Sequence, residues 1–217
     1  MPFWLAGSCG TANKLEAALQ LGAAGIQVGT AFAFCEESGV AAGLKRQILQ
    51  LGRAHQLEVF TDPLISPTGF PFKVVQLAGT LSESGSRTQR SRRCDLGFLR
   101  HAYRRADGTF GYRCPAEPVE DFVRKGGALE ETQGRECVCN GLLATIGLPQ
   151  IISQNEVSLP LVTAGNEIAH IARFLRPGQD SYNAAQVVGD LLGQASAAGN
   201  SVPNVQPLQG IPVVRMA

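Results

Sequence analysis

The stretch at residues 3–32 reads FWLAGSCGTANKLEAALQLGAAGIQVGTAF, and it decides the fold. The apolar run that ends at Ala6 predicts a strand over 2–6 that is covered on both faces. Thr11 can cap a helix over 12–21, because apolar side chains recur there at helical spacing and form one face. A further strand over 25–29 is then expected to lie parallel to the first, joined to it by a right-handed crossover.

Two turns of small residues follow these strands. Gly7 and Ser8 come directly after the first strand, and Gly29 and Thr30 come at the end of the second. The carboxyl ends of parallel strands lie at one edge of a sheet, and backbone N–H groups clustered near a helix N-terminus attract anions. The two turns therefore predict a site for one phosphate group. The alternative is that the glycines only make tight turns, as they do in many α/β proteins.

The order of these residues resembles that of the nitronate monooxygenase family, formerly called 2-nitropropane dioxygenases. The family has an Ala-Gly-Gly turn, a helix, a Gly-(Val/Ile)-Gln-(Met/Val)-Gly-Thr segment and then Glu-Ser, which correspond here to 6–8, 25–30 and 37–38. The likeness continues to about Tyr182 through the segments TDP at 61–63, SPTGFP at 66–71, CDLG at 94–97, GYRCPAEP at 111–118, GR at 134–135 and CVCN at 137–140. The chain is most similar to the longer, bacterial type of the family.

The resemblance implies an FMN enzyme on a (β/α)₈ barrel, in which both turns bind the flavin phosphate. The residues that match the phosphate-binding positions are Ala6, Gly7, Ser8, Gln27, Val28, Gly29 and Thr30. Gln27 is the weakest of them, since its side chain could face the barrel interior. Ser8 stands where the family usually has its second glycine. The activity implied is oxidation of an alkyl nitronate by flavin and dioxygen, which gives a carbonyl compound and nitrogen oxyanions.

The resemblance and the local sequence patterns together predict the domain organisation. In the family the two turns belong to the last two strand–helix units of the barrel, so residues 1–62 are expected to be the end of an FMN-binding barrel. Residues 63–195 are expected to form a mostly helical C-terminal region, with a short helix around Tyr103, and residues 196–217 a flexible tail. A barrel needs roughly 200 residues by itself. We therefore expect a C-terminal piece, completed by a missing N-terminal half or by a homo-oligomer.

Composition limits the classes of partner. Apolar residues make up 44% of the chain, charged residues 17%, and the net charge is +1, which argues against binding to nucleic acid or to a membrane surface through bulk charge. No apolar run approaches the ~20 residues that span a bilayer, and the N-terminus lacks the pattern of a signal peptide, so the cytoplasm is the expected location. The four arginines within 82–93 are interpreted as part of a mobile, solvated loop, because no aromatic residues are interleaved with them.

The six cysteines and three histidines provide no recognisable site. Cys94, Cys114, Cys137 and Cys139 could in number supply four thiolates to zinc or iron–sulfur, but their spacing departs from the usual paired pattern. We expect reduced, mostly buried thiols that do not share a metal. None of the histidines lies in a motif or matches the family's catalytic histidine, so no catalytic residue is assigned.

Two classes of function remain open. The first is an FMN-dependent, nitronate monooxygenase-like enzyme, with an FMN-dependent enoyl thioester reductase as the alternative within that class, because phosphate turns alone do not choose the substrate. The second is a catalytically inactive half-barrel relic or a module that binds a phosphate-bearing ligand.

Towards the C-terminal end of the chain, Asn166 and Ser181 are expected to cap two further helices.

Overall fold

A computed structural model describes residues 1–83, 91–154 and 156–193 of the chain. Its N-terminal unit consists of β1 (Trp4–Leu5), α1 (Ala12–Gln20) and β2 (Gly25–Ile26). The two strands pair in parallel, with Leu5 opposite Ile26, and Thr11 caps α1 by accepting the Lys14 N–H at 3.4 Å. The expected strand–helix–strand unit is therefore confirmed, although its strands are shorter than predicted.

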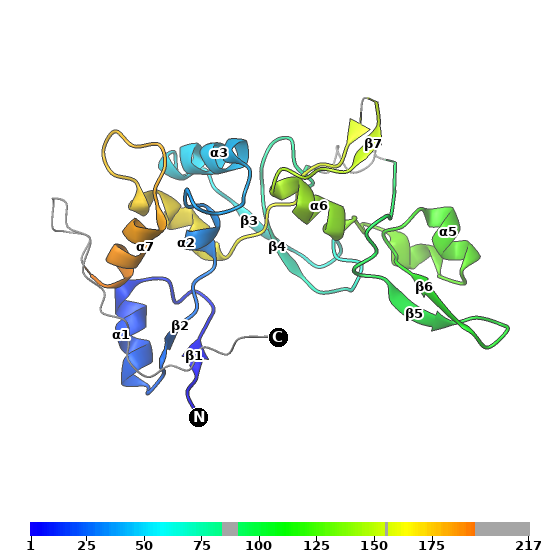
Figure 1. Cartoon of the computed structure of the whole chain (residues 1–217), viewed down its shortest axis with the longest axis horizontal. Helices are drawn as coiled ribbons and strands as arrows, with labels where there is room; N and C mark the ends of the chain where they lie inside the picture. Colours follow the sequence, from blue (N-terminus) through cyan, green and yellow to red (C-terminus); the bar gives the residue numbers. More distant parts are fainter. Residues whose placement is uncertain (84–90, 155, 194–217) are drawn as a thin grey trace, which may run out of the picture.

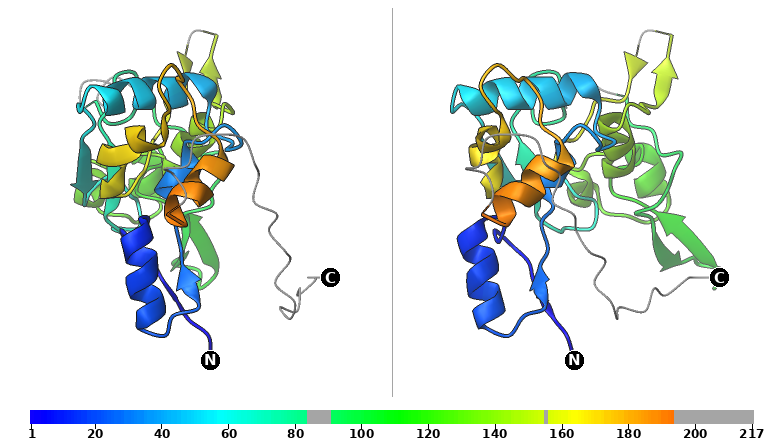
Figure 2. Two further views of the ribbon diagram at one scale, coloured as in Figure 1. Left: turned by 90° about the vertical axis from the view of Figure 1, so that its left-hand side faces the viewer. Right: turned by 60° about the vertical axis from the view of Figure 1, so that its left-hand side comes forward.

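The expectation that the first strand is covered on both faces is wrong for the described residues. Phe3 is 44% exposed and Trp4 53% exposed. The unit stands out from the body of the molecule, and α1 is the helix that lies beside the two strands (Figure 2). A buried parallel strand needs a packed layer on each of its two faces. In the described part of the chain, α1 covers one face of the β1–β2 pair. Whether the pair belongs to a barrel stays a prediction.

The main core joins residues 31–77 to residues 162–187 (Figure 1). The helices α2 (Thr30–Ala33) and α3 (Ala42–Arg53) supply Ala31 and Ile48 to it, and Phe34 at the end of α2 adds a third buried side chain. The 3₁₀ segment η2 (Asn166–Phe174) and α7 (Ala184–Leu191) supply Ile168, Ile171 and Val187. The buried Tyr182 hydroxyl donates a hydrogen bond to the Ala31 carbonyl at 2.6 Å, which joins α2 to the segment before α7.

The middle of the chain contains hairpins that the sequence did not predict. β3 (Val59–Asp62) pairs with β4 (Phe72–Val75), β5 (His101–Arg104) with β6 (Phe110–Arg113), and β7 (Ile151–Ser153) with β8 (Glu156–Val157), all antiparallel. The boundary expected after Asp62 falls between two paired strands. The region expected to be mostly helical is thus a mixture of helices and hairpins.

The predicted short helix around Tyr103 is wrong, because Tyr103 lies in β5. The turn signal Asp107-Gly108 closes the β5–β6 hairpin, with Gly108 in the left-handed region at φ +83°. Tyr103 then shares a face with Arg113, whose guanidinium lies 4.8 Å above the Tyr103 ring and 5.3 Å above that of Phe122. Tyr103 is paired with Gly111, and Arg113 is two residues beyond Gly111 on β6. Because side chains alternate between the two faces of a strand, Arg113 lies on the same face as Tyr103.

A smaller second core lies beside β4. It contains Ile65, Val74, Leu81, Val138 and Leu161, all nearly or fully buried. Three short helices follow β6 in the chain: α5 (Val119–Arg124), η1 (Leu129–Thr132) and α6 (Val138–Thr145), of which α6 supplies Val138 to this core.

Helix caps at the C-terminal end differ from those expected. Gly165, not Asn166, precedes η2, and Asn183, not Ser181, caps α7. Asn183 and Gln186 form a reciprocal capping box, which two side chains can make and a lone serine cannot. Ser181 instead bonds through its hydroxyl to the Glu36 carboxylate.

Part of the basic segment is held firmly rather than being a mobile loop. Arg92 donates to the carbonyls of Pro115 at 3.1 Å and Thr132 at 2.9 Å, and Arg93 donates to those of Ile151 and Ile152. The remainder of the segment, 84–90, and the tail expected at 196–217 lie outside the described residues.

Candidate functional site

The two turns named from the sequence lie next to each other. Leu5 and Ile26 are the last paired residues of the parallel strands, and the Gln27 N–H donates to the Leu5 carbonyl at 2.8 Å. The chain therefore leaves both strands at the same level. The first turn, residues 6–10, and the second turn, residues 27–30, start from adjacent points.

The first turn has an open, left-handed backbone. Gly7 has φ +83° and Ser8 φ +55°, and both are exposed. A Cβ atom built on Gly7 or on Gly29 would meet nothing within 4 Å, so there is free space in front of both glycines. A ligand atom can approach the backbone there, which is the usual reason for glycine beside a phosphate.

The backbone N–H groups of the two turns differ in whether they already have a hydrogen-bond acceptor. The N–H groups of Gly7, Ser8, Gly29 and Thr30 donate to no partner among the described residues. The Gly10 N–H, by contrast, donates to Oε1 of Glu167 at 3.1 Å. The first turn therefore already holds a carboxylate that comes from η2.

Two side chains of the second turn, those of Val28 and Thr30, contact other parts of the protein. Thr30 accepts the Gly165 N–H through Oγ1 at 2.9 Å. Val28 is half-buried against the main core, and its Cγ1 would lie 3.3 Å from a Cβ built on Gly10. Of the seven predicted residues, Val28 and Thr30 thus shape the turn with their side chains, and the Gln27 N–H is already used by the Leu5 carbonyl. Ala6, Gly7, Ser8 and Gly29 are mainly available through the backbone.

Sequence reasoning missed Glu167, Gly165 and Gly10 as parts of this site. Glu167 lies 157 residues from Gly10, and its only signal in the sequence is an acidic residue in the first turn of a helix, which many helices have. Gly10 is more informative, because a Cβ there would lie 2.6 Å from Oε2 of Glu167. A larger residue at this position would displace the Glu167 carboxylate, a contact that the sequence does not reveal.

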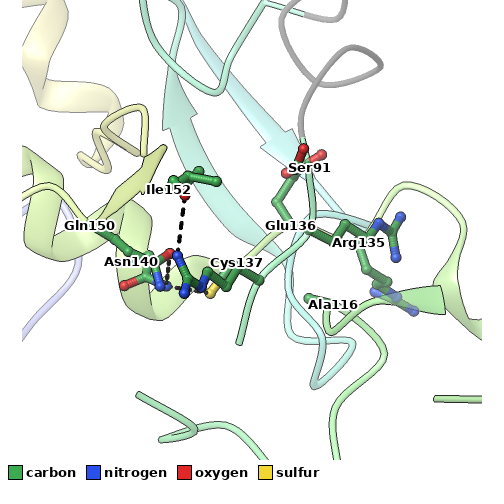
Figure 3. A pocket seen from close by; sticks show the side chains of 10 residues that line it. Ser91, Ala116, Arg135, Glu136, Cys137, Asn140, Gln150 and Ile152 are labelled. Carbon is green, nitrogen blue, oxygen red and sulfur yellow. Dashed lines mark hydrogen bonds between the residues drawn. The ribbon is translucent and has the colours of Figure 1, made fainter. Parts of the chain in front are cut away.

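A second polar site lies in the other half of the molecule, around a hollow of about 30 Å³ (Figure 3). Asn140 is 3% exposed and donates to Oδ1 of Asp95 at 2.8 Å, to Oε1 of Gln150 at 3.0 Å and to Sγ of Cys137 at 3.4 Å. Burial would raise the pKa of the Asp95 carboxyl, but the hydrogen bonds from Asn140 and from backbone N–H groups outweigh it and lower the pKa. The hollow has room for a water molecule and little more.

The four cysteines of the middle region lie close to one another. Burial raises the pKa of the Cys114 thiol to about 11, and the proximity of Cys94, Cys137 and Cys139 acts in the same direction. Burial also raises the pKa of Cys137. Among the residues that the structure describes, no three Cys, His, Asp or Glu side chains are arranged to hold a metal ion.

A larger hollow of about 290 Å³ opens beside α3. Its floor is formed by Phe34 and Leu49, and its rim by charged side chains of α3 and the segment before α7. Lys45 at this rim donates to the carbonyls of Cys35, Glu36 and Ser38 at 3.0–3.1 Å. These bonds use all three donors of the ammonium group, so Lys45 holds the loop before α3 in place.

Over the described ranges, none of the helices combines the length and the apolar character that crossing a bilayer requires.

Comparison with known proteins finds a family model that matches part of the chain. No curated protein and no solved structure matches the chain. Residues 1–62 match the family model described as nitronate monooxygenase, a range that includes both turns of the candidate site and ends with β3.

Proposed function

We propose that the chain is an FMN-dependent oxidoreductase of the nitronate monooxygenase type, and that its two N-terminal turns hold the phosphate end of the flavin. The observation that carries the proposal is the coincidence of two independent results. The family match falls on residues 1–62, and within that range the two turns that contain Gly7, Ser8, Gly29 and Thr30 follow a pair of parallel strands. Phosphate sites of α/β proteins lie at such strand ends.

The residues present fit the phosphate end of FMN. Four backbone N–H groups without a described partner, and free space in front of Gly7 and Gly29, are suited to the oxygens of a phosphate monoester. The isoalloxazine ring requires apolar walls, and the two hollows described above are lined by residues outside both turns. The proposal for this chain is therefore limited to binding and orienting the phosphate.

When bound, the flavin would supply the redox chemistry on an alkyl nitronate and dioxygen. The contribution of the described residues is positional. Gly7 and Gly29 allow the backbone to approach the phosphate, and Ser8 and Thr30 add N–H donors beside them. Each such contact near a helix end is worth typically ~0.3–1 kcal/mol at an exposed site, far below the ~8 kcal/mol of a micromolar complex. We therefore expect the chain alone to bind FMN weakly.

The test compares FMN with riboflavin, which carries the same ring without the phosphate. In ¹H–¹⁵N spectra of the labelled full chain, FMN should shift the amide signals of Gly7, Ser8, Gly29 and Thr30 at high micromolar to millimolar concentration. Riboflavin should leave them in place. Equal shifts with both flavins, or shifts confined to other residues, would contradict the proposed phosphate site.

Activity is measured separately, by oxygen consumption with an alkyl nitronate in the presence of FMN. We expect no turnover by the chain alone, because the walls for the flavin ring are not formed by the turns. Inorganic phosphate that shifts the four amides as strongly as FMN, without turnover, would favour the module that binds phosphate-bearing ligands. Micromolar FMN binding with turnover would show that the chain completes its own flavin site.

A further inference from the structure

The first turn of the candidate site is already in contact with an anion of the protein itself. Oε1 of Glu167 accepts the Gly10 N–H at 3.1 Å, and a Cβ atom on Gly10 would lie 2.6 Å from Oε2. Both carboxylate oxygens of Glu167 therefore lie against the backbone of Gly10. This backbone is two residues beyond Ser8 and directly before the capping residue of α1.

Three further contacts fix the carboxylate at the junction of the two turns. The Gly165 N–H donates to Thr30 Oγ1 at 2.9 Å, which anchors the start of η2 on the second turn. Arg173 at the other end of η2 donates to the Gly10 carbonyl. Val28 Cγ1 lies beside the carboxylate, 3.3 Å from where a Cβ atom on Gly10 would stand. Glu167 is thus held between the two anchored ends of η2, and its position does not depend on its own hydrogen bond alone.

We propose that Glu167 is a resident carboxylate that competes with the phosphate group for the turns, and so sets how tightly a phosphate monoester can bind. The inference rests on the proposed phosphate site and adds a residue that lies outside the range matched by the family model. Glu167 occupies one N–H donor of the first turn. It also places a negative charge at Gly10, in the same turn as the Gly7 and Ser8 donors.

The size of the effect follows from electrostatics. Two unit charges about 4 Å apart in a water-like medium repel each other enough to change an equilibrium constant by about fivefold, and less water around them increases the factor. Salt screens such a repulsion when the charges are exposed to solvent. Glu167 is half-buried, so we expect a moderate, salt-dependent weakening of phosphate binding in the native chain.

The experiment titrates the full chain and three variants with inorganic phosphate and, separately, with FMN, while the amides of Gly7, Ser8, Gly10, Gly29 and Thr30 are followed by ¹H–¹⁵N spectra. Glu167→Gln keeps an oxygen acceptor and removes the charge, and Glu167→Ala removes both. Glu130→Ala is the matched control, because Glu130 is an exposed glutamate in the first turn of the other described 3₁₀ segment, η1. Circular dichroism confirms that each variant is folded.

We expect Glu167→Gln to bind phosphate about fivefold more tightly than the native chain at low ionic strength, with a smaller gain at high salt. In Glu167→Ala the Gly10 amide should also respond to phosphate, whereas in the native chain it should not. Glu130→Ala should behave as the native chain. If binding appears only in the Glu167 variants, the carboxylate blocks the site in the native chain and the inference is supported.

Two other results would overturn the inference in different ways. Phosphate binding by the native chain that is unchanged or weakened in both Glu167 variants would show that Glu167 has a structural role, while the proposed phosphate site would stand. Absence of binding in the native chain and in both variants would overturn the phosphate site and, with it, the role of Glu167.

Discussion

At the scale of single residues, Ser8 is a position where the family resemblance and the backbone angle both favour glycine. The family to which the first turn is similar usually has glycine at this position, and the structure places Ser8 at φ +55°, in the region where a Cβ atom meets the following carbonyl oxygen. A serine there is strained, although its backbone N–H remains available. The sequence predicted the position of the turn but not its angle, because serine does not itself indicate a left-handed conformation.

Ser8→Gly should therefore stabilise the protein. A left-handed L-residue costs roughly 1–2 kcal/mol, and the added freedom of glycine in the unfolded chain cancels ~0.5–1 kcal/mol of the gain. We expect an increase of about 0.5–1 kcal/mol in the free energy of unfolding, measured by urea denaturation. Ser8→Ala keeps the Cβ atom and should bring no gain; an equal gain in both variants would mean that the hydroxyl group, not the angle, was unfavourable.

Cys114 is expected to be among the least reactive thiols of the chain. Its side chain is 5% exposed, and burial raises its pKa to about 11. At pH 8 a thiol with that pKa is about one part in a thousand thiolate, against roughly a quarter for an ordinary cysteine. Alkylation by iodoacetamide followed by mass spectrometry should label the partly exposed Cys9 far sooner than Cys114, and the rate at Cys114 should still be rising with pH above 9. Labelling of both at one rate would contradict the described burial.

At the scale of elements, the sequence was most informative where a local signal was strong. The helix α1 was predicted to within a residue because Thr11, an apolar face and Gly22 all indicated the same limits. The strand β5 was missed because its residues, His101 to Arg104, have no apolar alternation of their own and are held by pairing with β6. The cap of α7 was misplaced for a similar reason, since Ser181 and Asn183 are both good capping residues and the partner Gln186 decides between them.

The capping box of α7 provides a direct test. Asn183→Ala removes the acceptor of the Gln186 N–H, a bond of 2.9 Å, and should lower the free energy of unfolding by about 1 kcal/mol. Ser181→Ala, two residues earlier, removes a hydroxyl that bonds to an exposed carboxylate and should cost less than about 0.5 kcal/mol. Thermal and urea denaturation of the two variants measure the difference. A larger loss in Ser181→Ala would restore the cap predicted from sequence.

At the scale of the whole molecule, the prediction from sequence was sound for the N-terminal unit and poor for what surrounds it. The turns at 6–10 and 27–30 could be named because they are short and local. Their attachment to Gly165 and Glu167 could not, because those contacts join residues more than a hundred positions apart. The expected cover of the first strand failed for the same reason, since cover is a property of neighbouring elements and not of the apolar run itself.

The exposure of β1 can be measured directly, because Trp4 is the one tryptophan in the chain. At 53% exposure its indole should emit like tryptophan in water and should be quenched efficiently by iodide. If a second copy covers the β1–β2 pair, the emission should shift to shorter wavelength as protein concentration rises, and quenching should fall. Blue-shifted emission with weak quenching in dilute protein would contradict the exposed strand.

The bond between Tyr182 and Ala31 also has a consequence for synthesis of the protein in the cell. The two residues are 151 positions apart, and ribosomes add about 5–20 residues per second, so an interval of ~8–30 s separates their emergence. During that time Phe34 and Ile48 lack the C-terminal side chains that cover them in the finished molecule. The nascent chain therefore presents an uncovered apolar face for most of its translation, and chaperones that bind such faces should associate with it until α7 leaves the ribosome.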